Sequence, residues 1–171
     1  KNENSNAYTF LLFIHGGIDD TAPINAIIQK TIEAHTTTKC YDSVTLDFIH
    51  PDINFCGLLW SDFFANTTLH DKPIKNISKE RGGTSFTYNT SAARSFIQQH
   101  SSDNPDHTYT LQAIIRGHDH CKGGILRLRD VCENDQNFQA LPSEITETIK
   151  HGAVYTCISS PEGLGNCGCF D

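Results

Sequence analysis

The sequence predicts an α/β fold in a single domain of 171 residues. Three observations support this class. Short apolar runs rich in β-branched and aromatic residues, such as YTFLLFI at 8–14, are typical of strands. Isoleucines recur at helical spacing between residues 24 and 32, which is typical of an amphipathic helix. Segments of these two kinds alternate along the chain, as they do in α/β proteins.

Each element can be assigned from its local pattern. Residues 8–14 are expected to form a buried strand. Residues 23–35 are expected to form a helix with its isoleucine stripe in the core, and Asp19, Asp20 and Thr21 are candidate N-caps. The remaining elements are expected in this order: an extended segment at 43–49, a surface loop at 64–80, a short strand at 84–88, a helix from the Asn89 cap to His100, a strand at 111–115, a half-buried strand at 124–131, a polar excursion at 132–140, a short helix at 143–150 and a last strand at 154–158.

Residues 57–64, GLLWSDFF, combine a tryptophan and a carboxylate in an apolar setting. Trp60 is the only tryptophan, and we expect it to pack inside. Asp62 lies among apolar residues, so its carboxylate must be paired or lie at the rim of a site. A supporting role at a site and a structural hydrogen bond both remain open for Asp62.

The composition disfavours some classes of partner and compartment. The net charge is −7 and no basic stripe is present, which disfavours nucleic acid as a partner. No apolar run approaches the roughly 20 residues that span a bilayer. The seven cysteines form no CxxC pair, so we expect reduced thiols in a soluble protein of a reducing, cytoplasmic compartment. The chain begins at Lys1 and contains no Met, so a processed or excised piece is expected.

Histidines follow two of the expected strands. His15-Gly16-Gly17 ends the first apolar run, and Gly117-His118-Asp119-His120 follows the run at 111–115. Ligands in α/β sheets bind at the carboxyl ends of strands, and imidazole is a common ligand for Zn, Fe and Mn. A solvated His-rich turn is the alternative for the second segment. His120 is expected to face away from His118, because successive side chains of an extended segment alternate.

Arg81-Gly82-Gly83 is a candidate phosphate clamp. A guanidinium offers a planar fork to two phosphate oxygens, and the glycines leave room for the ligand to approach. The alternative is a surface Arg in a turn.

Five segments in chain order resemble the phosphoprotein phosphatases, which are Ser/Thr protein phosphatases of the calcineurin-like metallophosphoesterase class. FIHGGIDD resembles their HGG segment, GLLWSDF their LLWSDP segment, and RGGTSFTYN their RGVSFTFG segment. AIIRGHDH resembles their RAHQ segment, and AVYTCISSP resembles the final strand that ends in SAPNY. The resemblance implies that residues 1–171 form the C-terminal half of a metallophosphatase catalytic domain, which is half of a β-sandwich flanked by helices.

The resemblance also implies a chemistry. The expected reaction is hydrolysis of phosphoserine and phosphothreonine in a phosphoprotein substrate by two divalent metal ions, Mn, Fe or Zn. His15 and His118 match two ligands of one ion. Arg81 matches the arginine that binds the substrate phosphate and offsets its charge. Asp62 matches an aspartate near the metals that does not ligate them.

The chain departs from the family pattern in two respects. It lacks the upstream D-x-H, GDxxDRG and GNHE segments, so the fragment alone is expected to be inactive and its N-terminal half must come from elsewhere. It also lacks the Tyr of SAPNY, because Glu162 follows Pro161. Alternatives are a non-catalytic binding module on the same fold, or a tyrosine or nucleotide phosphoesterase. The Asn-, His- and Thr-rich chain suggests a microbial member or a bacterial effector.

Overall fold

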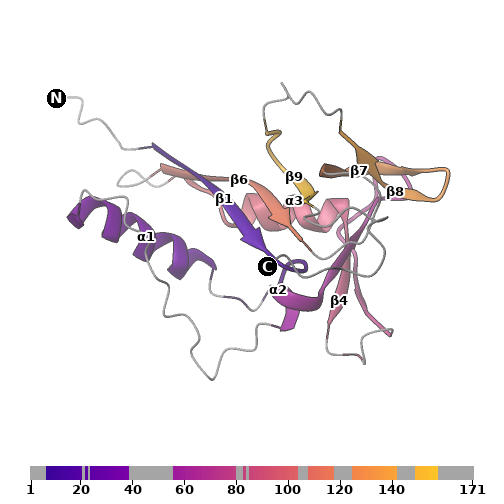
Figure 1. Ribbon diagram of the computed structural model, residues 1–171, viewed down its shortest axis with the longest axis horizontal. Coiled ribbons are helices and arrows are strands. Elements are labelled where there is room, and N and C mark those ends of the chain that lie inside the picture. Colours follow the sequence, from indigo (N-terminus) through magenta and orange to yellow (C-terminus); the bar gives the residue numbers. More distant parts are fainter. Residues whose placement is uncertain are drawn as a thin grey trace, which may run out of the picture.

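The computed structural model describes residues 7–20, 22, 24–38, 56–79, 83, 85–103, 108–117, 125–141 and 149–157. Within these ranges the fold is mixed α/β, with two sheets and three helices (Figure 1). The expected class is therefore confirmed, whereas the assignment to half of a metallophosphatase β-sandwich stays a prediction. No helix in the described part of the chain is long and apolar enough to cross a membrane.

The larger sheet brings the ends of three parallel strands to one edge. Its strands lie in the order β1 (Ala7–Ile14), β6 (Thr108–Arg116), β9 (Ala153–Cys157), β7 (Ile125–Glu133) and β8 (Gln136–Ala140), and β5 (Ser102–Asp103) pairs with β6. β6 is parallel to both β1 and β9, whereas β7 is antiparallel to its two neighbours. The carboxyl ends of β1, β6 and β9 consequently share an edge, which is where α/β sheets bind ligands.

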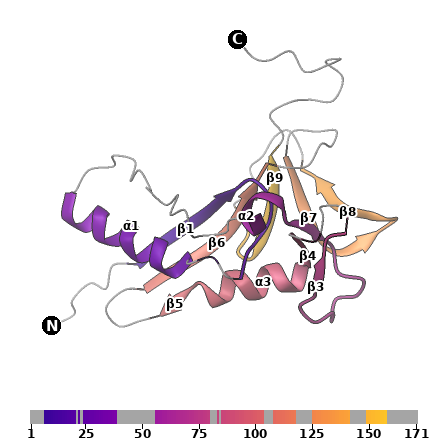
Figure 2. The same ribbon diagram turned by 90° about the horizontal axis from the view of Figure 1, so that it is seen from below.

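The smaller sheet and the helices pack around the larger sheet. The small sheet has the order β2 (Asp62–Phe64), β4 (Phe86–Asn89), β3 (Lys75–Ile77). α2 (Cys56–Trp60) leads into β2, and α3 (Thr90–Gln99) follows β4 directly. α3 lies against one face of the larger sheet, and α1 (Ile24–Thr38) lies on its β1 side (Figure 2).

One hydrophobic core joins these elements. The isoleucine stripe of α1 is buried as expected, with Ile24, Ile28 and Ile32 each at most 4% exposed. α3 contributes three buried side chains, and the strands of the larger sheet supply the opposite wall: Ala93, Phe96 and Ile97 from the helix, and Tyr109, Leu111, Ile114, Leu128 and Val154 from the strands. The expected helical and strand faces therefore meet in a single core.

The prediction that Asn89 caps a helix extending to His100 is confirmed. The side-chain oxygen Oδ1 of Asn89 accepts from the backbone N–H of Ala92 at 2.9 Å and from that of Ile74 at 2.8 Å. The side-chain nitrogen Nδ2 of Asn89 donates to the backbone carbonyl of Lys72 at 2.9 Å. Asn89-Thr90-Ser91 also matches the N-x-S pattern of a glycosylation acceptor, but Asn89 is fully buried and its side chain is inaccessible in the folded chain.

Two predicted loops contain strands. Residues 64–80 include β3, whose three side chains are all exposed, so no apolar alternation marks it in the sequence. Residues 132–140 include β8, which pairs with β7 across a tight turn. Asn134 and Asp135 in that turn have φ of 50° and 59°, a region that these two residue types tolerate and that two-residue hairpins require.

β1 is exposed on one face, which corrects the expectation of a buried strand. Its side chains alternate between exposed and half-buried, with Phe13 71% exposed. β1 is the end strand of the described sheet, and the alternating exposure shows that the face carrying Phe13 is not covered by another layer among the described residues. The expected segment at 43–49 lies outside the described residues, as does the expected helix at 143–150 apart from Ile149 and Lys150, which are not helical.

Candidate functional site

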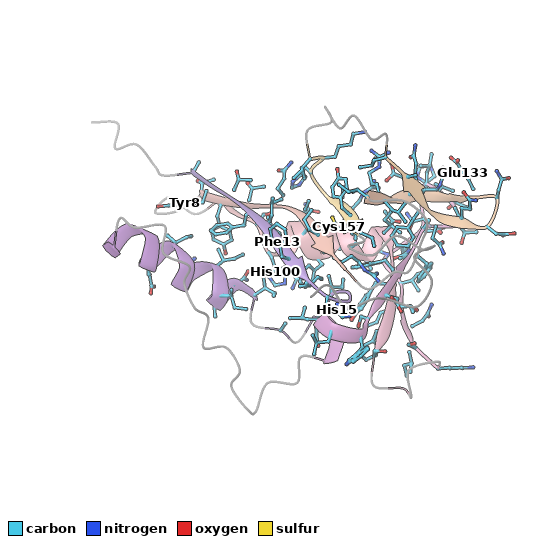
Figure 3. The ribbon with its side chains drawn as sticks, viewed as in Figure 1. Tyr8, Phe13, His15, His100, Glu133 and Cys157 are labelled. Atoms are coloured by element: carbon cyan, nitrogen blue, oxygen red, sulfur yellow. The ribbon has the colours of Figure 1, made fainter. Side chains whose placement is uncertain are left out.

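His15 lies at the carboxyl end of β1, on the edge where the parallel strands end (Figure 3). The parallel register pairs Ile14 with Arg116, so the next residues, His15 and Gly117, are neighbours. A Cβ atom placed on Gly117 would lie 3.5 Å from Nδ1 of His15. Because His118 follows Gly117 in the chain, the structure places His15 beside the residue that precedes the other predicted metal ligand.

The His15 imidazole rests against Trp60 of α2. The two rings are nearly perpendicular, at 88°, with centroids 6.3 Å apart. Trp60 is 46% exposed, so the prediction that it packs inside is wrong. Instead, the indole lies at the surface beside an exposed imidazole, and this edge-to-face contact restricts the ring of His15.

The glycines after His15 are required by close packing. A Cβ atom on Gly16 would lie 2.5 Å from the backbone carbon and oxygen of Leu59, and one on Gly17 would lie 2.9 Å from Ser61. The N–H of Gly16 donates to the carbonyl of Leu58 at 2.7 Å. The sequence suggested room for a ligand at these glycines. In the structure the space is filled by the backbone of α2 and Ser61, which fixes the segment that carries His15.

The residues after the glycines anchor the same segment to the smaller sheet. Asp20 forms an ion pair with Lys75 of β3, at 2.7 Å between carboxylate and ammonium. The ammonium group of Lys75 also lies 4.0 Å from the ring centroid of Phe86. The loop from His15 to Asp20 is thus held by α2 on one side and by β3 on the other.

Arg116 is a buried, paired charge that the sequence reasoning missed. It is the last residue of β6, where the sequence suggested only a strand break before Gly117. Its side chain is 0% exposed, and Nη2 donates to Oδ1 of Asp62 at 2.9 Å. The sequence did contain a signal for this pair. Arg116 follows an apolar run and Asp62 interrupts another, and a buried charge needs a partner of opposite charge. Of the two expectations for Asp62, pairing or a position at the rim of a site, the structure confirms the pairing.

Two predicted site residues, Arg81 and His118, lie outside the described residues, as does His120, which was expected to face away from the site. Among the residues that the structure does describe, no three His, Cys, Asp or Glu side chains are grouped closely enough to hold a metal ion. His15 is therefore the one predicted metal ligand whose position is known, and the shared ion and the phosphate clamp stay predictions.

Burial perturbs two titratable groups near the core. Burial raises the pKa of Tyr88, and the Asp20 and Asp19 carboxylates raise it further by opposing a phenolate. Tyr88 is only 3% exposed, and its hydroxyl makes no hydrogen bond to another described residue. Burial lowers the pKa of His100, whose Nδ1 lies 2.8 Å from Oδ1 of Asn25. Both groups stay neutral at pH 7, and neither lies among the predicted site residues.

Comparison of the chain with protein-family models, curated proteins and solved structures gives no match. The family resemblance therefore depends on the five sequence segments alone.

Proposed function

We propose that this chain supplies one half of a two-metal site that hydrolyses phosphoserine and phosphothreonine in proteins. The observation that carries the proposal is the position of His15 beside Gly117. β1 and β6 are parallel neighbours, so the residues that follow them emerge at one edge of the sheet. That topology favours a shared ion for imidazoles at positions 15 and 118.

The accessible imidazole of His15 supports a divalent transition metal at this edge. His15 is exposed at a strand end, and Gly117 has no side chain to obstruct the approach to Nδ1. His15 and His118 would hold one ion. A bound metal supplies Lewis acidity and a hydroxide nucleophile at neutral pH. The ligands of the second ion would come from a partner segment that carries the upstream motifs absent from residues 1–171.

Arg81 and Asp62 have different roles in this proposal. Arg81 would hold the substrate phosphate and offset its charge in the transition state. Asp62 would act as a positioning residue, because its carboxylate accepts from Arg116 at the end of β6. Fixing that strand end fixes the start of the segment that carries His118.

Metal binding tests the site directly. Calorimetric titration with Mn²⁺ should show affinity lost by at least tenfold in His15→Ala and His118→Ala. His120→Ala and the exposed His70→Ala are controls and should bind as the unmodified chain does. Binding that is unchanged in His15→Ala and His118→Ala would exclude a shared ion. Loss in His120→Ala instead of His118→Ala would show that the other histidine of the pair is the ligand.

Hydrolysis tests the reaction. The chain should be combined with the segment proposed to carry the upstream ligands, and phosphate release should be measured from phosphoserine and phosphotyrosine peptides. Faster release from phosphoserine supports the proposal, and faster release from phosphotyrosine replaces its substrate class. Metal binding without any release would identify a non-catalytic binding module.

A further inference from the structure

A histidine and a cysteine lie on either side of a glycine at the edge where the parallel strands end. The register pairs the last residues of β1 and β6, and it pairs Arg116 of β6 with Thr156 of β9. The residues that follow these paired positions are His15, Gly117 and Cys157, so the three form one row across the sheet. His15 and Cys157 are labelled at these strand ends in Figure 3.

The histidine and the cysteine of this row project from the same face of the sheet. The residues that precede the row belong to the opposite face, because Arg116 and Thr156 are buried and Ile14 packs against the core. Side chains alternate between the two faces along a strand, so the next residues point the other way. His15 and Cys157 are both exposed, as this alternation predicts.

Gly117 leaves the space between the two side chains open. A Cβ atom at position 117 would lie 3.5 Å from Nδ1 of His15, so the imidazole already reaches the middle strand of the row. Neighbouring strands are about 4.8 Å apart, and the thiol of Cys157 has one such spacing left to cover. A cysteine side chain and a Zn–S bond of about 2.3 Å span that distance. An ion above Gly117 can therefore contact both donors.

The chemistry of the two donors favours zinc. Thiolate is a soft ligand that selects Zn²⁺ over Mn²⁺, and cysteine with histidine is a common zinc ligand set. Cys157 forms no disulfide within the described part of the chain. On coordination its S–H bond is replaced by an S–Zn bond, and the proton goes to solvent. An imidazole that ligates through one nitrogen keeps a hydrogen bond through the other, so the site is compatible with the other contacts of His15.

We propose that Cys157 is a ligand of the ion at His15, and that this ion is Zn²⁺. His118, which follows Gly117 in the chain, would supply a third donor and leave the fourth position open, as in catalytic zinc sites. The inference rests on the proposed function, because it adds a ligand to the same ion and narrows the choice among Mn, Fe and Zn to Zn.

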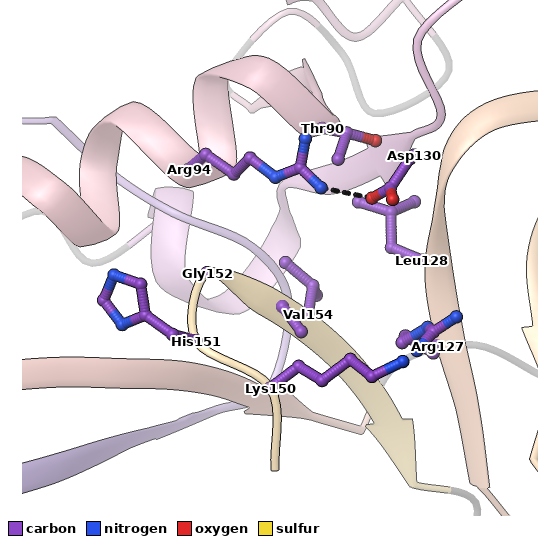
Figure 4. A pocket seen from close by; sticks show the side chains of 10 residues that line it. Thr90, Arg94, Arg127, Leu128, Asp130, Lys150, His151, Gly152 and Val154 are labelled. Atoms are coloured by element: carbon purple, nitrogen blue, oxygen red, sulfur yellow. Dashed lines mark hydrogen bonds and ion pairs between the residues drawn. The ribbon is translucent and has the colours of Figure 1, made fainter. Parts of the chain in front are cut away.

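Metal affinity of the full 171-residue chain tests the ligand. Calorimetric titration in a phosphine reductant should give a Zn²⁺ Kd that rises at least about tenfold in Cys157→Ser, because losing even a residue behind a metal ligand costs roughly 10–100-fold. The Mn²⁺ Kd of the same variant should change less, because Mn²⁺ gains little from a thiolate. Two controls should keep the Zn²⁺ Kd: Cys132→Ser in β7, and His151→Ala in the pocket at the amino end of β9 (Figure 4).

Co²⁺ in place of Zn²⁺ reports the metal–sulfur bond itself. A thiolate bound to Co²⁺ gives an intense charge-transfer band in the near ultraviolet, which histidine ligands do not give. The band should be present in the unmodified chain and in Cys132→Ser, and it should be lost in Cys157→Ser. Circular dichroism confirms folding. Gly117→Ala keeps the thiol but fills the space beside Nδ1 of His15, so it should raise the Co²⁺ Kd and keeps the test valid if Cys157→Ser does not fold.

The outcomes separate this inference from the proposed function. Zn²⁺ binding that is lost in His15→Ala and His118→Ala but kept in Cys157→Ser overturns the thiolate ligand and leaves the proposed shared ion in place. A charge-transfer band that is lost in Cys157→Ser and His15→Ala but kept in His118→Ala supports the thiolate ligand and removes the shared ion. A band that persists in Cys157→Ser, or no band in the folded chain, overturns the inference.

Discussion

Arg116 and Asp62 connect the two sheets through one charged hydrogen bond of 2.9 Å. Arg116 ends β6 in the larger sheet, and Asp62 begins β2 in the smaller sheet. The guanidinium also lies 5.5 Å from the ring centroid of Phe63. The cation is fully buried while the Asp62 side chain is 27% exposed, so the arginine depends on the carboxylate more than the reverse.

Removing the carboxylate should therefore destabilise the fold. We expect Asp62→Ala to lower the free energy of unfolding in urea by about 3 kcal/mol, because it leaves a buried cation without this partner. Asp130→Ala removes an exposed ion pair and should cost at most about 1 kcal/mol. A double variant, Asp62→Leu with Arg116→Met, should recover part of the loss. Equal costs for Asp62→Ala and Asp130→Ala would contradict this account.

The elements that sequence alone could assign are those whose pattern reflects burial on one side. α1 and α3 follow from apolar side chains at helical spacing and, for α3, from the Asn89 cap. β3 could not be found, because its exposed side chains leave no pattern and its pairing with β4 is a long-range event. The same limit applies to the site. His15 was identifiable from a strand end, whereas the pairing of the buried Arg116 with Asp62 forms only when the two sheets meet.

The close contact of Gly16 with α2 predicts a stability effect. Gly16→Ala places a Cβ atom 2.5 Å from the Leu59 backbone, which cannot move aside as a flexible side chain could. We expect a loss of about 1–3 kcal/mol in urea unfolding, the usual cost of overpacking. Gly117→Ala is the matched control. Its Cβ atom would lie at an ordinary 3.5 Å from His15, and its stability should change by about 0.5 kcal/mol or less. A tolerated Gly16→Ala would argue against this packing.

Asn89 should contribute more to stability than an ordinary cap. Asn89→Ala removes the acceptor at the start of α3 and leaves the Ile74 N–H and the Lys72 carbonyl without their side-chain partner. The expected loss is about 2–4 kcal/mol in chemical denaturation, which adds the cap to the buried hydrogen bonds. Asn76→Ala, at an exposed position of β3, should change stability by about 0.5 kcal/mol or less. A cost for Asn89→Ala within the range of a simple exposed cap would show that the two other bonds contribute nothing.

Burial of His100 predicts a pH dependence of stability. Its folded pKa lies below the ordinary value of 6.5, so between these two values the unfolded chain binds more protons than the folded chain. Stability from this group is full above pH 6.5 and falls as the pH drops from 6.5 to the folded pKa. His100→Gln should reduce the loss of unfolding free energy between pH 7.5 and pH 5. His70→Gln, at an exposed position, should keep the slope of the unmodified chain. Identical slopes in all three proteins would exclude His100 as the source.

Arg81 provides the sharpest test of the proposed chemistry, in the chain combined with the segment proposed to carry the upstream ligands. A planar guanidinium can hold two phosphate oxygens at once, and an ammonium group cannot reproduce that geometry. Arg81→Lys should therefore lower kcat/KM for a phosphoserine peptide. The fall should correspond to a loss of about 2–4 kcal/mol of transition-state stabilisation, as when one preorganised donor to a developing anion is removed. Both kcat and KM should change, while metal content is kept, because the arginine would hold the transferring group and not the ions. Arg129→Lys changes an arginine that pairs with Glu133 on the β7–β8 hairpin, and it should leave the kinetics unchanged. Kinetics of Arg81→Lys that match those of Arg129→Lys would identify Arg81 as an ordinary surface residue.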